Sequence, residues 1–222
     1  MGIKTMLNSV VRKGLFILIG VVALAGLTTP VQAVPITFNF TGTVTGVDSS
    51  LSPTFSTGQT LTGSYTFEST TPPRAGSDSS FAVYDALTAV NFSIGSYSAS
   101  STAAPEIQID NAPGAPNDRY GLVSRASDGL TGPAVNGNTL GAFLFRLDDV
   151  NNAVFSTALS LPTSLSLQDF TSNSFFVFFG DFSITGTLNS LSSAAPVPEP
   201  STFFLLGAGL SGIGFLRRRF RS

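Results

Sequence analysis

Hydrophobic and polar residues alternate in many short segments between residues 34 and 195. Seven segments show this alternation or a short apolar run, namely 34–47, 60–67, 90–95, 107–109, 143–147, 175–179 and 182–188. A period of two is typical of a strand with one buried face. Clusters of Gly, Pro, Asn, Asp and Ser separate the segments, as turns require. The pattern therefore predicts an all-β domain of roughly seven to nine strands.

The fold class follows from the number and shortness of these segments. They favour a single β-sandwich or jelly-roll-like domain. Only residues 81–89 carry a pattern that also fits a helix. Fifteen phenylalanines lie between residues 34 and 195. Because one face of each strand must be buried, we expect these rings to fill the core rather than to line a ligand site.

The first 33 residues have the order of a secretory signal peptide. Arg12 and Lys13 precede the apolar run 14–27, and Pro30 and Val31-Gln32-Ala33 follow it. Small residues of this kind mark a cleavage site, which we place between Ala33 and Val34. The alternative is an uncleaved anchor, but the apolar run spans only about 21 Å as a helix, against a hydrocarbon core of roughly 30 Å. We therefore expect export through the Sec translocon.

Residues 196–222 contain three parts in a characteristic order. The sequence Val197-Pro198-Glu199-Pro200 comes first, the apolar run 202–216 follows, and the cluster Arg217, Arg218, Arg219 and Arg221 comes last. This order resembles the PEP-CTERM sorting signal of Gram-negative bacteria. The resemblance implies that an exosortase, a processing enzyme of the inner membrane, recognises the precursor, and that residues 202–216 anchor it as a transmembrane helix.

The residues themselves agree with this interpretation. Pro198 and Pro200 lack a backbone N–H and have a fixed φ, so their segment stays extended and does not join a following helix. Glycines at four positions of the apolar run allow another helix to approach closely in a membrane. The alternative, a buried C-terminal helix of the exported domain, leaves the four arginines unexplained.

Charge is unevenly distributed along the chain. Residues 34–198 contain four arginines, no lysine and twelve acidic residues, a formal charge of −8, whereas basic residues are concentrated near both termini. By the positive-inside rule both basic ends are expected in the cytoplasm, with the acidic domain on the far side of the membrane. The mature form is then expected at the cell surface or secreted. Nucleic-acid binding is disfavoured because the domain lacks clustered basic residues.

Composition excludes several kinds of chemistry. The chain has no Cys, no His and no Trp, so it forms no disulfide, no thiolate nucleophile, no Ser-His-Asp triad and no imidazole metal site. A hydrolase would have to rely on carboxylates, among them Glu68 and Glu106, and nothing in the sequence singles out a pair. We therefore expect a protein without catalytic activity.

Two loops carry oxygen ligands suited to calcium. One contains Asp110, Asn117 and Asp118, and the other begins with Asp148 and Asp149. Calcium binds six to eight such oxygens, but neither loop has the spacing of an EF-hand. Asp and Asn also occur in turns for their own backbone hydrogen bonds. We therefore expect no cofactor and keep calcium as the alternative.

These observations define an expected function. We expect an exported envelope or extracellular-matrix protein with a structural or adhesive role. The resemblance to PEP-CTERM proteins implies a surrounding of exopolysaccharide or biofilm. The alternatives are a carbohydrate-binding module and a carboxylate-dependent glycoside hydrolase that acts on exopolysaccharide.

Overall fold

The computed structural model describes residues 35–102, 105–111 and 118–194. Internal contacts divide the chain into two units, Met1–Val34 and Pro35–Ser222, and all described residues belong to the second. The strands are β1 (Pro35–Val47), β2 (Thr60–Glu68), β3 (Phe81–Tyr84), β4 (Leu87–Ile94), β5 (Tyr97–Ser101), β6 (Glu106–Asp110), β7 (Asp118–Arg125), β8 (Leu140–Asp149), β9 (Ser172–Phe179) and β10 (Phe182–Ser193). Three single-turn 3₁₀ helices accompany them, η1 (Ser49–Leu51), η2 (Ala126–Asp128) and η3 (Leu167–Asp169).

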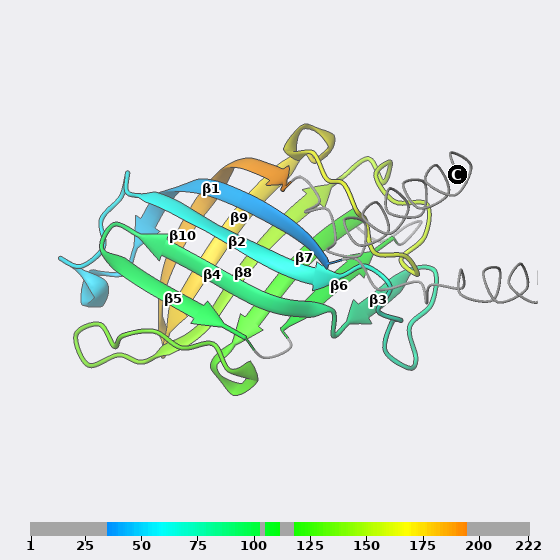
Figure 1. The fold of residues 1–222 in the computed structure, drawn as a ribbon. Coiled ribbons are helices and arrows are strands. Elements are labelled where there is room, and N and C mark those ends of the chain that lie inside the picture. The colour runs from blue at the N-terminus through cyan, green and yellow to red at the C-terminus, as the bar shows by residue number, and fades with distance from the viewer. Residues whose placement is uncertain (1–34, 103–104, 112–117, 195–222) are drawn as a thin grey trace, which may run out of the picture. The chain divides into compact units, whose positions relative to one another are not determined.

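All ten strands belong to one antiparallel sheet with the order β3-β6-β7-β8-β9-β10-β1-β2-β4-β5. Figure 1 shows β1, β2, β4 and β5 in front, with β7, β8 and β9 crossing behind them. The sheet therefore folds over itself, and its two halves face each other across a shared core. Two packed layers are thus made from one continuous sheet.

The middle of the sheet, where β1 pairs with β10, is irregular. The register shifts between Thr41 and Gly42 and again between Val44 and Gly46. Such bulges bend a strand and increase its twist. A methyl group on Gly186 of β10 meets the ring of Phe175 and the carbonyl oxygen of Thr43. Glycine is required there because the ring occupies the space of a side chain.

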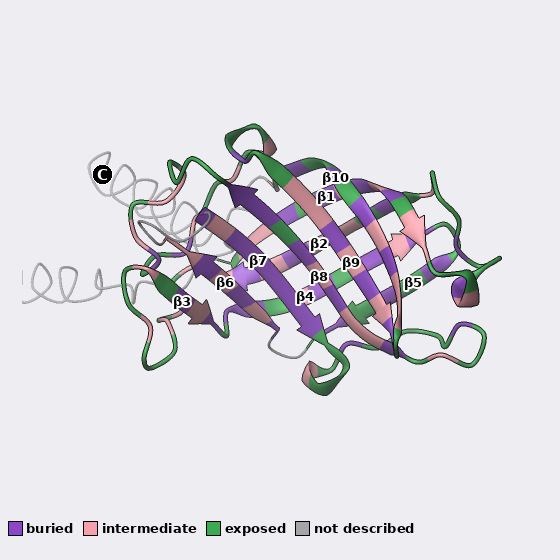
Figure 2. Cartoon of the chain, turned by 180° about the vertical axis from the view of Figure 1, so that it is seen from behind, coloured by how far each residue is buried: buried purple, intermediate pink, exposed green. Residues whose placement is uncertain are grey.

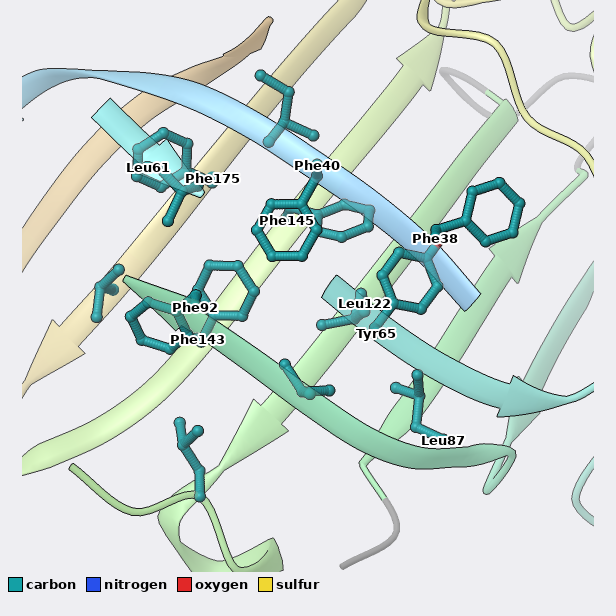
Figure 3. Packing of buried hydrophobic residues seen from close by; sticks show 14 of the residues in the cluster. Phe38, Phe40, Leu61, Tyr65, Leu87, Phe92, Leu122, Phe143, Phe145 and Phe175 are labelled. Atoms are coloured by element: carbon teal, nitrogen blue, oxygen red, sulfur yellow. The ribbon is translucent and has the colours of Figure 1, made fainter. Parts of the chain in front are cut away.

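Aromatic rings join the two halves of the sheet. Phe92 of β4 stacks on Phe143 of β8 with ring centroids 4.4 Å apart, and Phe40 of β1 meets Phe145 of β8 edge-on at 5.7 Å. Figure 3 shows these rings converging between the front and rear strands. Both arrangements are favoured by the ring quadrupole. The expectation that phenylalanines fill the core is confirmed for ten of the fifteen, which are buried: Phe38, Phe40, Phe55, Phe67, Phe92, Phe143, Phe145, Phe170, Phe175 and Phe179.

Connecting segments cover both edges of the sheet. At the β5 edge, the N–H of Ser100 donates to the carbonyl of Thr131 at 3.0 Å, and the N–H of Thr131 donates back at 2.9 Å. At the β3 edge, the N–H of Arg74 donates to the carbonyl of Val83 at 2.8 Å. Unpaired strand edges favour aggregation, so these contacts protect the domain from edge-to-edge association.

The prediction of an all-β domain is confirmed for the described residues. Each of the seven predicted segments forms the body of a strand, in which inward positions are mostly buried and outward positions are exposed or half-buried (Figure 2). Residues 81–89 form β3 and the start of β4, not a helix. The predicted range of seven to nine strands was too low, because β5 and β7 lack a clear alternation of hydrophobic and polar residues. Inward positions of β5 include Ala99 and Ser101, and β7 is buried on both faces along most of its length.

All four tyrosines of the chain are buried. The hydroxyl of Tyr120 lies 3.3 Å from that of Tyr65 in the core, and the hydroxyl of Tyr84 donates to the carbonyl of Ala158 at 2.6 Å. Burial raises the pKa of each tyrosine above its ordinary value, and it raises the pKa of Tyr97 to about 12. The folded state therefore keeps these protons to higher pH than the unfolded state does.

Replacing Gly186 with alanine should destabilise the fold, because the new methyl group collides with Phe175 and with backbone. We expect the free energy of unfolding to fall by about 1–3 kcal/mol, as for other overpacked sites. Gly121→Ala is the matched control, since its methyl group would lie 3.7 Å from the nearest atom, Cβ of Gln108. Urea denaturation measures both. An equal loss in the two variants would contradict the steric origin of the effect.

The tyrosines also predict how stability depends on pH. Tyrosine in the unfolded chain titrates near pH 10, and the folded pKa values are higher. Stability from these groups is therefore complete below about pH 10 and is lost as the pH rises from there toward the folded pKa values. We expect tyrosinate absorbance to appear only together with loss of the β circular dichroism signal. The chain contains no Trp, so the change in absorbance reports on tyrosine alone. Titration near pH 10 of a protein that remains folded would refute this.

Candidate functional site

Two of the predicted calcium ligands, Asp118 and Asp149, are buried opposite each other in register on β7 and β8. One oxygen of Asp118 accepts the N–H groups of Val154 at 3.0 Å and Phe155 at 2.9 Å. The oxygens of Asp149 accept the N–H groups of Asn151 at 3.1 Å and Ala153 at 2.9 Å. The bonds from Ala153 and Asn151 lower the pKa of Asp149. Both carboxylates thus hold the segment that follows β8.

The other described candidates, Asp110 and Asp148, lie on the opposite face of the sheet. Strand residues alternate between faces, and Asp148 is the neighbour of Asp149. Arg119 donates from Nε to one oxygen of Asp148 at 2.7 Å, and Arg146 donates from Nε to the other at 2.7 Å. Asp110 lies 3.7 Å from the guanidinium of Arg119. The four carboxylates are therefore divided between two faces and do not converge on one point.

Most of the ion-paired residues of the domain lie on and beside β6, β7 and β8. Each of the four arginines between residues 34 and 198 is in an ion pair: Arg74 with Asp85 and Glu106, Arg119 with Asp110 and Asp148, Arg125 with Glu106 and Asp128, and Arg146 with Asp148. Both oxygens of Glu106 contact a guanidinium, at 3.0 and 2.8 Å. The arginines are partly exposed, so each pair contributes little to stability. Nevertheless, both carboxylate oxygens of Glu106 are engaged in ion pairs.

The opposite half of the sheet has a neutral polar surface. Strands β1, β2, β4, β5 and β10 contain only one charged residue, Glu68, at the last position of β2. Their outward positions are mostly Ser, Thr and Asn, and many are joined across strands. Thr62 and Ser93 hydroxyls lie 2.8 Å apart, Asn91 donates from Nδ2 to Ser64 at 2.8 Å, and Thr41 and Ser190 hydroxyls lie 2.7 Å apart.

A groove of about 530 Å³ lies on this neutral surface. We call it the hydroxyl groove. Its polar lining comes from Asn39, Thr62, Ser64, Asn91, Ser93, Ser98, Ser100 and Thr131. Sequence reasoning did not find it, because serine and threonine on the outward face of a strand resemble ordinary solvated positions. The detectable signal was the absence of charge from five strands.

A second surface feature lies on β9. The rings of Phe176 and Phe178 are half-buried and stack nearly parallel, with centroids 6.2 Å apart and 14° between their planes. Leu144 and Ala142 of β8 lie opposite them in register. Phe176 and Phe178 form an aromatic strip. It is separated from the hydroxyl groove by the fold of the sheet, because β9 and the strands β2, β4 and β5 belong to different halves.

The described carboxylates give an expected response to calcium. Each already accepts protein donors, and within residues 35–102, 105–111 and 118–194 no group of three or more acidic residues is placed to hold a metal ion. A ligand that binds only the folded state raises the melting temperature by mass action. We expect the melting temperature of the full-length protein in detergent to be the same in EDTA and in excess calcium. A calcium-specific shift of several degrees, absent with magnesium, would reverse this conclusion.

Several predicted sites lie outside the described residues. These are the cleavage site at Ala33 and Val34, the loop residue Asn117, the motif Val197 to Pro200, the helix 202–216 and the arginines at 217, 218, 219 and 221. Among the helices that the structure does describe, none is long and apolar enough to cross a membrane.

Comparison with known proteins bears on the C-terminal region. A family model described as the PEP-CTERM protein-sorting motif matches residues 196–219. Comparisons with curated proteins and with solved structures gave no match. The match confirms the resemblance noted for residues 196–222, and the motif indicates exosortase-dependent sorting of an exported protein. The chain therefore carries a PEP-CTERM protein-sorting motif, which follows the β domain in the sequence.

Proposed function

We propose that this protein is a non-catalytic component of the cell envelope or extracellular matrix, with a structural or adhesive role in a polysaccharide-rich surface or biofilm. The observation that carries the proposal is the sorting motif at residues 196–219. In this scheme the signal peptide directs residues 34–195 across the inner membrane, and exosortase then processes the anchored precursor near Pro198-Glu199-Pro200. The mature domain reaches the cell surface or the medium.

The surface chemistry of the domain supports a role without catalysis. Glu106 and Asp148 each have both carboxylate oxygens engaged by arginines. A carboxylate that donates a proton to a glycosidic oxygen needs access to the substrate. Asp118 and Asp149 are buried and accept backbone hydrogen bonds. The glycoside hydrolase alternative therefore receives less support than a binding role.

The sequence at residues 197–221 supports the proposed processing steps. The two prolines favour an extended segment of the kind that fits a protease-like active site. The arginines that follow the apolar run resist translocation and keep that end in the cytoplasm. Long arginine side chains also extend toward the membrane surface, which lets a short apolar run serve as an anchor.

Replacement of Pro198, Glu199 and Pro200 by alanine should leave export intact and block processing. Alanine favours helix over proline by roughly 3 kcal/mol per residue, so the recognition segment would join the neighbouring helix. Full-length protein should then accumulate in the inner membrane, as measured by fractionation and an antibody to the β domain. Pro72→Ala with Pro73→Ala, in the loop between β2 and β3, is the control and should be processed normally.

Neutral residues in place of the four C-terminal arginines should act at another step. The anchor should slip through the membrane, and unprocessed protein should appear outside the inner membrane.

If the alanine variant of the Pro-Glu-Pro triplet is processed and released like the wild type, the triplet is only a linker and the proposal is wrong.

A further inference from the structure

We propose that the hydroxyl groove binds a neutral polysaccharide chain that lies across strands β1, β2, β4 and β5. The inference rests on the proposed function, because it names the ligand through which the exported domain adheres. Its evidence is independent of the sorting motif and consists of the register, hydrogen bonding and charge of the described residues. The polar lining of the groove comes from side chains on four neighbouring strands and from Thr131.

The register places the lining in two rows that run across the strands. Asn39, Ser64, Asn91 and Ser100 are successive partners on β1, β2, β4 and β5. Thr62, Ser93 and Ser98 form the second row on β2, β4 and β5. Neighbouring strands are about 4.8 Å apart, so each row presents a hydrogen-bonding side chain at that regular interval. A polymer that lies along the rows meets polar groups on both sides.

The lining combines fixed and available hydrogen-bonding groups. The Thr62–Ser93 and Ser64–Asn91 contacts hold four of the side chains in place. Asn39, Ser98 and Ser100 are exposed, and within the described part of the chain their side chains have no protein hydrogen-bond partner. Hydroxyl and amide groups both donate and accept. A sugar hydroxyl needs such partners, and a lining that is already ordered reduces the entropy cost of binding.

Charge selects a neutral ligand over an anionic one. The groove lining contains no charged side chain, and the arginines of the domain are paired on and beside β6, β7 and β8. The domain also carries a formal charge of −8 over residues 34–198, which repels uronate or sulfate groups. The lining is too polar to favour a lipid or an apolar peptide. The chemistry that fits it is an uncharged chain of sugars.

Thr131 gives the groove a defined end. It lies in the segment between β7 and β8 and is held against β5 by the two backbone hydrogen bonds to Ser100. The groove is therefore lined by strands of one half of the sheet and by a connecting segment that pairs with β5. Its shape depends on the closed β5 edge, so the groove forms only in the folded domain.

The test is binding of defined polysaccharides to the full-length protein in detergent, by affinity electrophoresis. The neutral probes are dextran, soluble xyloglucan and galactomannan, and the anionic probes are alginate and hyaluronan. We expect retardation by at least one neutral polymer and none by the anionic polymers. Retardation by the anionic polymers alone, or by none of the five, would overturn the proposal.

Variants then locate the binding surface. Asn39→Ala, Asn91→Ala and Ser100→Ala together remove three of the four side chains in the first row, and we expect Kd to rise about tenfold or more, since each hydrogen bond contributes about 0.5–1.5 kcal/mol. Thr45→Ala, Asn189→Ala and Ser190→Ala remove similar groups from the same sheet face outside the groove and should leave Kd unchanged. Ser98→Tyr fills the groove from an exposed position and provides a second variant if the triple variant unfolds.

Two further outcomes separate the groove from the aromatic strip and from the sorting motif. If Phe176→Ala with Phe178→Ala abolishes binding while the groove variants bind normally, the aromatic strip is the site and this proposal is wrong. The groove variants should be exported and processed like the wild type, because they leave residues 196–219 intact. Lost binding with normal processing thus tests the groove alone, and failed processing of the Pro-Glu-Pro variant tests the sorting scheme alone.

Discussion

The contact between aromatic rings of the two sheet halves is the interaction on which this domain depends. Phe40 and Phe92 on one half meet Phe143 and Phe145 on the other, and the wholly buried hydroxyls of Tyr65 and Tyr120 meet beside them. One continuous sheet buries both of its inward faces only if it folds over. The bulges between β1 and β10 and the glycine opposite Phe175 provide that bend. With no disulfide and no α-helix among the described residues, ring packing has to stabilise the bend.

Folding the sheet also separates two kinds of surface. One half presents paired charges on β6, β7 and β8, and the other presents hydroxyl and amide groups with almost no charge. Because side chains alternate between faces, every buried aromatic residue of β1, β2 and β4 is next to an outward polar residue. The core and the neutral surface are therefore specified by the same segments of sequence. A change of register by one residue would exchange them.

The sequence allowed much of the fold to be predicted and little of the surface function. Strands such as β1 and β2 were predictable because Phe38, Phe40, Tyr65 and Phe67 alternate with Thr and Asn. Strand β7 was not, because its outward residues Gly121 and Val123 are buried as well, so the polar half of the alternation is missing. Asp118 and Asp149 looked like metal ligands, but both hold a loop in place. The N–H groups that donate to Asp118 come from residues more than thirty positions away in the sequence. The groove requires the register of four strands, which no local pattern contains. The sorting signal was predictable because its parts follow one another in one short stretch of sequence, residues 196–219.

The weak affinity expected of a single groove for the proposed polysaccharide explains why the proposed destination is a surface. Hydrogen bonds between hydroxyl groups replace bonds to water, so each contributes only about 0.5–1.5 kcal/mol. A shallow polar groove without aromatic stacking therefore binds a polymer weakly as a single site. Many copies on one surface that face one long polymer gain affinity through their high effective concentration. In this proposal, adhesion requires sorting to a surface, because only a surface brings many copies together. A protein with such a groove adheres where it is displayed densely, and it releases the polymer readily when it is dilute.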